Sequence, residues 1–239
     1  MNITEQKTVA EVVTENIKAA HIFKKHGIDF CCGGGITIEK ACAKNGVDYA
    51  VLGKELEEID ENVPRAYNYD SWDLGFLSDY IVNTHHKYVE ESIPVLLEYA
   101  AKVANVHGHH YKEVVEINEL VIEIAKELAV HMKKEELILF PFIKQLVIAD
   151  KKKLKPDLPL FGTVNDPIEM MEDEHENAGD IFKRIAKLSN NYTPPSEACN
   201  TFRALYAKLQ EFEDDLHRHV HLENNILFPK TKILEQKLF

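Results

Sequence analysis

The chain has 239 residues, of which 45% are apolar and 28% charged, and 28 basic against 40 acidic residues give a formal net charge of −12. This apolar content is ordinary for a globular protein and excludes wholesale disorder. An acidic chain without clustered Lys and Arg does not suit nucleic acid or an anionic membrane surface. No apolar run approaches the roughly 18 residues of a membrane span, and the N-terminus lacks the apolar core of a secretory signal, so we expect a cytoplasmic protein.

Residues 1–62 are predicted to form a small helical domain. Apolar residues from Val9 to Phe23 have helical spacing as one run, which ends at His26-Gly27 because glycine suits a left-handed helix cap. Two further helices are expected at about 37–44 and 50–59, after a glycine-rich segment that contains Cys31 and Cys32. A domain of about 60 residues is marginal in stability when it folds alone.

Residues 63–239 are predicted to form an antiparallel four-helix bundle. Pro64 and the polar-aromatic stretch at 67–70 are typical of a linker, and a helix is expected from about Ser71, capped by Asp70 or Ser71. Four long helical patterns follow at about 71–105, 113–148, 163–190 and 196–236, separated by turn residues. No segment shows the period-2 alternation of a strand, so the expected fold class is all-α.

An internal repeat is the most informative feature of the sequence. The pattern H-x-x-x-E-x-x-I-L-F-P occurs from His131 to Pro141 and again, 88 residues later, from His219 to Pro229. In both copies the His and the Glu are four residues apart, so they lie on the same face of a helix. An imidazole and a carboxylate together suit a borderline metal ion, and the apolar residues that follow would keep the site dry.

The repeat implies that the first and third long helices also correspond. They carry His86 and His175, which are 89 residues apart, and each half of the bundle then supplies a lone His followed by a His-x-x-x-Glu pair. Packed around a pseudo-twofold axis, the two halves direct four histidines and two glutamates into the core. This is a ligand set for two metal ions with bridging carboxylates: His86, His131, Glu135, His175, His219 and Glu223.

Other polar residues near this set are not assigned as metal ligands. His86 is preferred to its neighbour His85, because His86 shares its helix face with apolar residues whereas His85 lies on the side of two serines. His217 and His221 point about 200° away from His219 and are predicted to lie at the surface. Glu136 and Glu174 are interpreted as solvated carboxylates, with support of the ligands from behind or proton handling as the alternative.

Cys31 and Cys32 are expected to be free thiols, because neighbouring cysteines bridge only with a strained ring. The preceding cations, Lys24, Lys25 and His26, and a helix N-terminus near Thr37 should favour the thiolate. Three glycines, Gly33 to Gly35, would let the backbone approach a ligand or partner closely. A buried thiol pair beside a flexible turn is the alternative.

Together these motifs resemble the iron–sulfur cluster repair proteins, the "repair of iron centres" family with a hemerythrin-like domain. The resemblance covers nearly the whole chain and rests on Asp29-Phe-Cys-Cys-Gly-Gly, both copies of the His-x-x-x-Glu repeat, Glu174-His175 and the segment Pro194-Pro195-x-Glu197-Ala-Cys199. It implies a non-haem centre of two Fe ions held by the six residues above. It also implies repair of iron–sulfur clusters damaged by nitric oxide or oxidants.

Three functions stay open at this point. The first is a repair factor that supplies iron to iron–sulfur client proteins, with Cys31 and Cys32 passing iron or electrons. The second is a di-iron reductase of nitric oxide or peroxide. The third, weaker alternative is reversible oxygen binding, for which the thiol pair has no task. The sequence leaves the clients, the electron donor and the oligomeric state open, a homodimer included.

Overall fold

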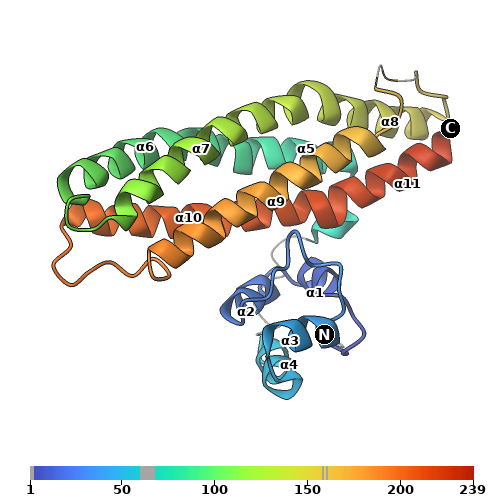
Figure 1. The fold of residues 1–239 in the computed structure, drawn as a ribbon. Helices are drawn as coiled ribbons and strands as arrows, with labels where there is room; N and C mark the ends of the chain where they lie inside the picture. Colours follow the sequence, from blue (N-terminus) through green and yellow to red (C-terminus); the bar gives the residue numbers. More distant parts are fainter. Residues whose placement is uncertain (1–2, 60–67, 158, 160) are drawn as a thin grey trace.

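The computed structural model describes residues 3–59, 68–157, 159 and 161–239, so the expected domain boundary at 62/63 and Pro64 lie outside the described residues. Four long helical rods run side by side in alternating directions, and a cluster of short helices lies against one side of them (Figure 1). The described residues contain no strand, only one isolated bridge between Thr8 and Thr37. The predicted all-α class and helical bundle are confirmed.

The N-terminal region has four short helices, α1 (Val9–Glu15), α2 (Ala19–Lys25), α3 (Ile38–Asn45) and α4 (Tyr49–Glu57). The single run expected from Val9 to Phe23 is wrong, because Asn16 is extended (φ −151°, ψ 103°) and separates α1 from α2. Its side chain accepts a hydrogen bond from the Lys18 N–H, an alternative to the helical ladder that Asn offers readily. A capping box between Thr8 and Glu11 begins α1.

Three of the four rods are interrupted by a π-helical turn. The first rod consists of α5 (Leu74–Ile81), a turn at Val82–His86 and α6 (Lys87–His107). The second consists of α7 (Glu113–Lys134), a turn at Glu135–Leu139 and α8 (Phe140–Lys152), and the third is α9 (Asn165–Leu188). The fourth consists of α10 (Asn200–Leu222), a turn at Glu223–Leu227 and α11 (Phe228–Leu238).

The first rod begins slightly later than expected. Residues Tyr69–Ser71 form a single 3₁₀ turn, and Asp73, not Asp70 or Ser71, caps α5. Its Oδ1 accepts hydrogen bonds from the N–H groups of Gly75 and Phe76 at 3.0 and 3.3 Å, which satisfies the exposed donors of the first helical turn.

Two apolar clusters fill the bundle, with a polar layer between them. One cluster contains Leu77, Phe140 and Phe228 at the end formed by α5, α8 and α11. The other contains Val89, Leu128 and Phe212 and continues into the N-terminal helices. Between them lie buried polar residues, among which are all six predicted metal ligands. The apolar ends therefore supply the packing energy and shield the polar layer from water.

The N-terminal helices dock beside α9 and α10 (Figure 1). The buried Phe30 ring packs against His217 and His221, with centroids 5.8 and 6.0 Å away. Lys24 forms ion pairs with Glu213 and Asp214 of α10 at 2.5 and 2.6 Å. Within the described part of the chain, no helix is both long and apolar enough to cross a membrane.

Only one of the three glycines after the cysteines is required by close packing. A Cβ on Gly34 would lie 2.3 Å from the Phe30 carbonyl oxygen, whereas a Cβ on Gly35 would meet nothing within 4 Å. The close approach is therefore to the chain's own backbone.

Gly34→Ala is expected to destabilise the N-terminal region by about 1–3 kcal/mol, because backbone must move to admit the methyl group. Gly35→Ala is the matched control and should change stability by no more than about 0.5 kcal/mol. Thermal and denaturant unfolding of both full-length variants would measure this. Equal effects of the two substitutions would contradict the packing argument.

Candidate metal centre

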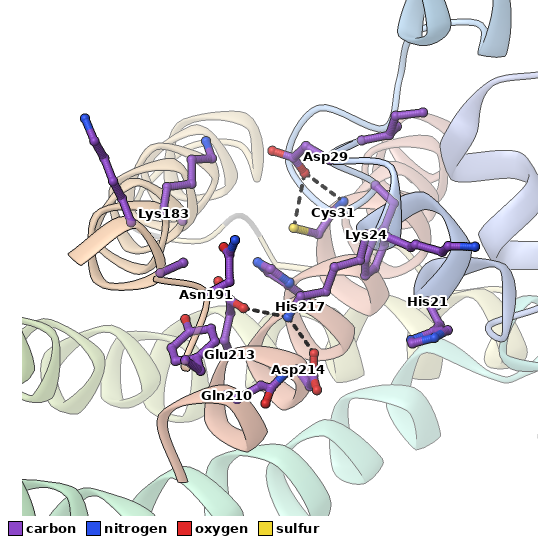
Figure 2. Close-up of a pocket in the computed structure, with 18 of the residues that line it drawn as sticks. His21, Lys24, Asp29, Cys31, Lys183, Asn191, Gln210, Glu213, Asp214 and His217 are labelled. Carbon is purple, nitrogen blue, oxygen red and sulfur yellow. Dashed lines mark hydrogen bonds and ion pairs between the residues drawn. The ribbon is translucent and has the colours of Figure 1, made fainter. Parts of the chain in front are cut away.

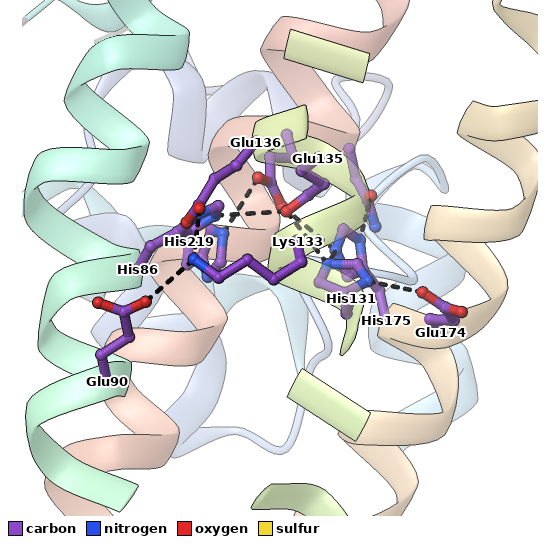
Figure 3. A network of polar contacts seen from close by, with 11 residues as sticks. His86, Glu90, His131, Lys133, Glu135, Glu136, Glu174, His175 and His219 are labelled. Atoms are coloured by element: carbon purple, nitrogen blue, oxygen red, sulfur yellow. Dashed lines mark hydrogen bonds and ion pairs between the residues drawn. The ribbon is translucent and has the colours of Figure 1, made fainter. Parts of the chain in front are cut away.

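The six predicted ligands come together in the polar layer as two overlapping groups. His86 and His219 form one group with Glu135 and Glu223, and His131 and His175 form the other with the same two glutamates. In each group the donor atoms lie within 4.8 Å of one another, and all six side chains are buried. Figure 3 shows the histidines converging from different rods. Both carboxylates thus belong to both groups, the arrangement expected of bridging ligands.

Several donor atoms in this layer are buried without a hydrogen-bond partner in the described part of the chain. They are Nε2 of His86, both carboxylate oxygens of Glu135 and Oε2 of Glu223. The contacts of these atoms are long. His86 Nε2 and His131 Nε2 lie 3.3 and 3.4 Å from Glu135 Oε2, and His175 Nε2 lies 3.2 Å from Glu223 Oε2. Orphaned buried polar atoms are costly and rare in folded proteins. Their convergence fits metal ions as the missing partners.

The electrostatics of the two buried glutamates also favour bound cations. Burial raises the pKa of Glu135, and the neighbouring Glu223 carboxylate raises it further. Burial also opposes ionisation of Glu223, but the charge of His219 and the close contacts of His175 and His219 outweigh it and hold the pKa of Glu223 well below its usual range. Two adjacent buried carboxylates do not both ionise readily without a compensating cation. Divalent ions would supply that charge.

A second layer of side chains holds three of the four imidazoles through Nδ1. Glu136 lies 2.9 Å from Nδ1 of His86, Glu174 lies 2.8 Å from Nδ1 of His131, and the Asn224 oxygen lies 2.8 Å from Nδ1 of His175. These oxygens only accept, so each Nδ1 carries a proton. In the neutral imidazole the lone pair is then on Nε2, which faces the centre. That is the tautomer a metal-binding histidine needs.

The interpretation of Glu136 and Glu174 as solvated carboxylates is therefore wrong. Both are partly buried and bound to imidazoles, and Lys133 and Lys134 pair with their other oxygens. The hydrogen bond from His131 in particular lowers the pKa of Glu174 to about 2. One signal was available in the sequence: Glu136 and Asn224 occupy the same repeat position, 88 residues apart, and both are polar beside a ligand glutamate.

Histidines outside the two groups are less exposed than expected. His85 is buried, against the prediction of a wetter face, and its Nδ1 lies 3.0 Å from Asp215 while its ring stacks on His219. His221 is buried and His217 half-buried, because the N-terminal helices cover both. The prediction that these two lie at the surface is wrong. Neither they nor His85 belong to a donor group.

The thiol pair lies against the middle of α9, beside His175. Cys31 and Cys32 are unbridged, with their sulfur atoms 3.7 Å apart. The Cys32 sulfur is 3.7 Å from the carbonyl oxygen of His175, and the Asn224 amide nitrogen, which belongs to the residue that also holds His175, is 3.4 Å from the Cys31 carbonyl oxygen. Contacts from the two cysteine residues thus reach His175 and the residue that holds it, Asn224.

The predicted cations do not activate the thiols. Lys24 is paired with Glu213 and Asp214, whereas Lys25 and His26 contact Glu55 at 2.9 and 3.2 Å. The two thiols instead differ from each other. The hydrogen bond from Cys31 lowers the pKa of Cys32, while that same contact, together with burial, raises the pKa of Cys31. Ionisation is therefore easier at Cys32 than at Cys31.

Two cavities reach these features. A cavity of about 420 Å³ between α7 and α9 is lined by His131, Glu174 and His175. A larger cleft of about 950 Å³ lies between the N-terminal helices and α9–α10, with Cys31, Cys32 and Lys183 among its lining residues (Figure 2). The smaller cavity thus reaches two histidines of one donor group, and the larger cleft reaches the thiols.

Comparison with known proteins agrees with this site. Residues 78–231 match the Hemerythrin HHE cation binding domain, and residues 5–60 match ScdA_N, a domain of unknown function. The chain is 35% identical to a probable iron–sulfur cluster repair protein of Haemophilus influenzae over 97% of this chain and 98% of that protein. It is 36% identical to the iron–sulfur cluster repair protein YtfE of Musicola paradisiaca, over 95% and 96% of the two chains.

A third relative, the iron–sulfur cluster repair protein ScdA of Staphylococcus haemolyticus, is 34% identical over 95% of this chain and 99% of its own length. The chain belongs to the iron–sulfur cluster repair protein family. Its bundle is a hemerythrin-like, cation-binding domain. The resemblance stated from the motifs is therefore confirmed.

Removing one shared carboxylate should affect both metal ions. Glu135→Ala and Glu223→Ala are each expected to abolish binding of two ferrous ions per chain, because each glutamate belongs to both donor groups. Iron content after anaerobic reconstitution, measured by elemental analysis, would check this. His217→Asn, which alters a histidine outside both groups, should retain both ions. Retention of one ion in Glu135→Ala would contradict a bridging role.

Proposed function

We propose that this family member holds two irons in its bundle and supplies iron to damaged iron–sulfur client proteins. His86 and His219 would bind one iron, His131 and His175 the other, and Glu135 and Glu223 both. The observation that carries this proposal is the sharing of two buried, hydrogen-bond-deficient carboxylates between two donor groups. Repair is the function that the names of all three relatives state.

The ligand set alone also suits manganese or zinc, so the choice of iron rests on the family. When bound, the irons supply a labile metal pool and a position for an exogenous ligand such as nitric oxide or oxygen. The chain's own residues fix the imidazoles through Glu136, Glu174 and Asn224, and the two apolar clusters exclude bulk water. Such outer contacts typically change metal affinity by about 10–100-fold.

The docking of the thiol pair favours iron supply over storage. Cys32 contacts the backbone of the proposed ligand His175, and the pair opens to a cleft large enough for part of a client protein. A site that only stored oxygen would have no use for this segment. Reduced neighbouring thiols persist in a reducing compartment, so we place the protein in the cytoplasm.

Reduction of nitric oxide or peroxide is the second candidate, and one observation favours it. The cavity between α7 and α9 is lined by His131 and His175, so a small molecule can approach two proposed ligands without passing the thiols. In that case the irons would stay in place through many turnovers, and the cysteines would be dispensable.

Measuring the iron content of the protein during cluster repair separates the two functions. With a nitric-oxide-damaged iron–sulfur enzyme as client, the iron-loaded protein should lose iron in step with the clusters rebuilt. The double variant Cys31→Ser/Cys32→Ser should retain two irons but lose at least about 90% of repair, because the transfer group is gone. Cys42→Ser/Cys199→Ser is the matched control and should repair normally. Sustained reduction of nitric oxide by the double Cys31/Cys32 variant, with full iron and no repair by the wild type, would establish the reductase instead.

A further inference from the structure

A third set of metal-ligating atoms lies outside the bundle centre. Asp29, Cys31 and Cys32 each offer one ligand atom, and these atoms lie within 4.8 Å of one another. We propose that these three residues form a transfer site for a single divalent ion of borderline or soft character, which is ferrous iron in transit between the bundle and a client. The assignment of iron as cargo rests on the proposed function. The site itself rests on its own geometry.

The spacing of the donors fits one tetrahedral ion. Bonds of about 2.3 Å to sulfur and about 2.1 Å to oxygen place two sulfurs about 3.8 Å apart and a sulfur and an oxygen about 3.6 Å apart. The two sulfur atoms are 3.7 Å apart, and the Cys31 sulfur is 3.4 Å from Asp29 Oδ1. A disulfide would need the sulfurs at about 2.05 Å, so the pair is arranged for chelation rather than for bonding to itself.

The loop holds these atoms in place by contacts that do not involve the sulfurs. Asp29 Oδ1 accepts hydrogen bonds from the N–H groups of Cys31 and Cys32 at 3.1 and 3.0 Å. The Asn225 amide nitrogen donates to the carbonyls of Phe30 and Cys31 at 3.3 and 3.1 Å. A pre-formed ligand set requires less ordering when the ion binds.

Three protein ligands leave a fourth position open, and the surroundings suit passage rather than storage. The Cys31 side chain and Asp29 lie at the wall of the large cleft, and Lys183 of α9 stands on the facing wall (Figure 2). Its positive charge acts on both Asp29 and Cys32, and it would weaken the hold on a bound cation. A client cysteine could take the fourth position from the cleft.

Binding of the ion at this site needs no oxidant or reductant. Each thiol that becomes a ligand releases its proton to solvent in the cleft, and the carboxylate binds as it stands. The iron remains ferrous throughout. Departure of the ion to client thiolates returns protons to Cys31 and Cys32, so no electron is gained or lost.

Cobalt(II) is a suitable probe, because its bonds to thiolate give a near-ultraviolet charge-transfer band that bundle ligands, all nitrogen and oxygen, do not give. Anaerobic titration of the reduced, metal-free, full-length protein should produce this band with one cobalt per chain. Cys42→Ser/Cys199→Ser should leave it unchanged, and Cys31→Ser/Cys32→Ser should abolish it. Absence of a thiolate band in the wild type would overturn the proposal.

Asp29→Asn tests the third ligand. An asparagine oxygen can still accept the two backbone hydrogen bonds, so the loop should keep its shape while the carboxylate is lost. We expect cobalt at the thiols to bind at least about tenfold more weakly. The variant should still bind two further ions in the bundle, which shows that it is folded. An unchanged thiolate affinity in folded Asp29→Asn would overturn the three-ligand site.

Glu135→Ala separates this inference from the proposed function. The thiolate band should persist in that variant, because the transfer site does not use the bundle ligands. A wild type that rebuilds clusters but shows no thiolate band would overturn the transfer site and leave iron supply standing. A bundle that takes up no iron would overturn the proposed function, and iron as the cargo with it, even with the thiolate band present.

Discussion

The bundle depends on the burial of two carboxylates in the middle of an apolar core. Glu135 and Glu223 are both fully buried, and within the described residues the oxygens left without a hydrogen bond include both of Glu135. Removing an ion from water costs several kcal/mol even after relaxation, unless a counter-charge is close. Metal binding and folding of this layer would therefore be linked, because ions bound between the two carboxylates would also stabilise the folded state.

Two of the three π-helical turns begin at these carboxylates. The N–H of Phe140 donates to the carbonyl of Glu135, and the N–H of Phe228 donates to that of Glu223, five residues back rather than four. The next residue in each copy is Pro141 or Pro229, which has no N–H to continue the helical ladder. An extra residue in the turn changes the direction of the side chains around it, and such turns are frequent at functional sites. Each ligand glutamate begins one.

Features set by local spacing could be predicted from the sequence. Four rods, the paired His and Glu at i and i+4, and the choice of His86 all depend on helical periodicity and on a repeat of 88 residues. Features set by docking could not. His221 lies on a polar face of α10 by periodicity, and it is buried only because Phe30 and Thr14 from the N-terminal helices cover it. The π-helical turns likewise have no period of their own to detect.

The two halves of the repeat are alike at the ligands and differ immediately after them. Glu136 and Leu137 in the first copy correspond to Asn224 and Asn225 in the second. Leu137 is 72% exposed, whereas Asn225 donates to the backbone of Phe30 and Cys31. Both Glu136 and Asn224 accept from a ligand histidine, so that task does not explain the change.

The difference between Glu136 and Asn224 is explained by the contact that Asn224 makes with the N-terminal region. A glutamate at position 224 could still accept from His175, but it has no N–H to donate and would place a carboxylate against the Cys31 carbonyl. An amide does both, since its oxygen holds the imidazole and its nitrogen points at the thiol loop. The amide on this side of the pseudo-twofold axis thus contributes to the docking of the N-terminal region. The bundle is symmetric at the proposed metal ligands and asymmetric where it meets the cysteines.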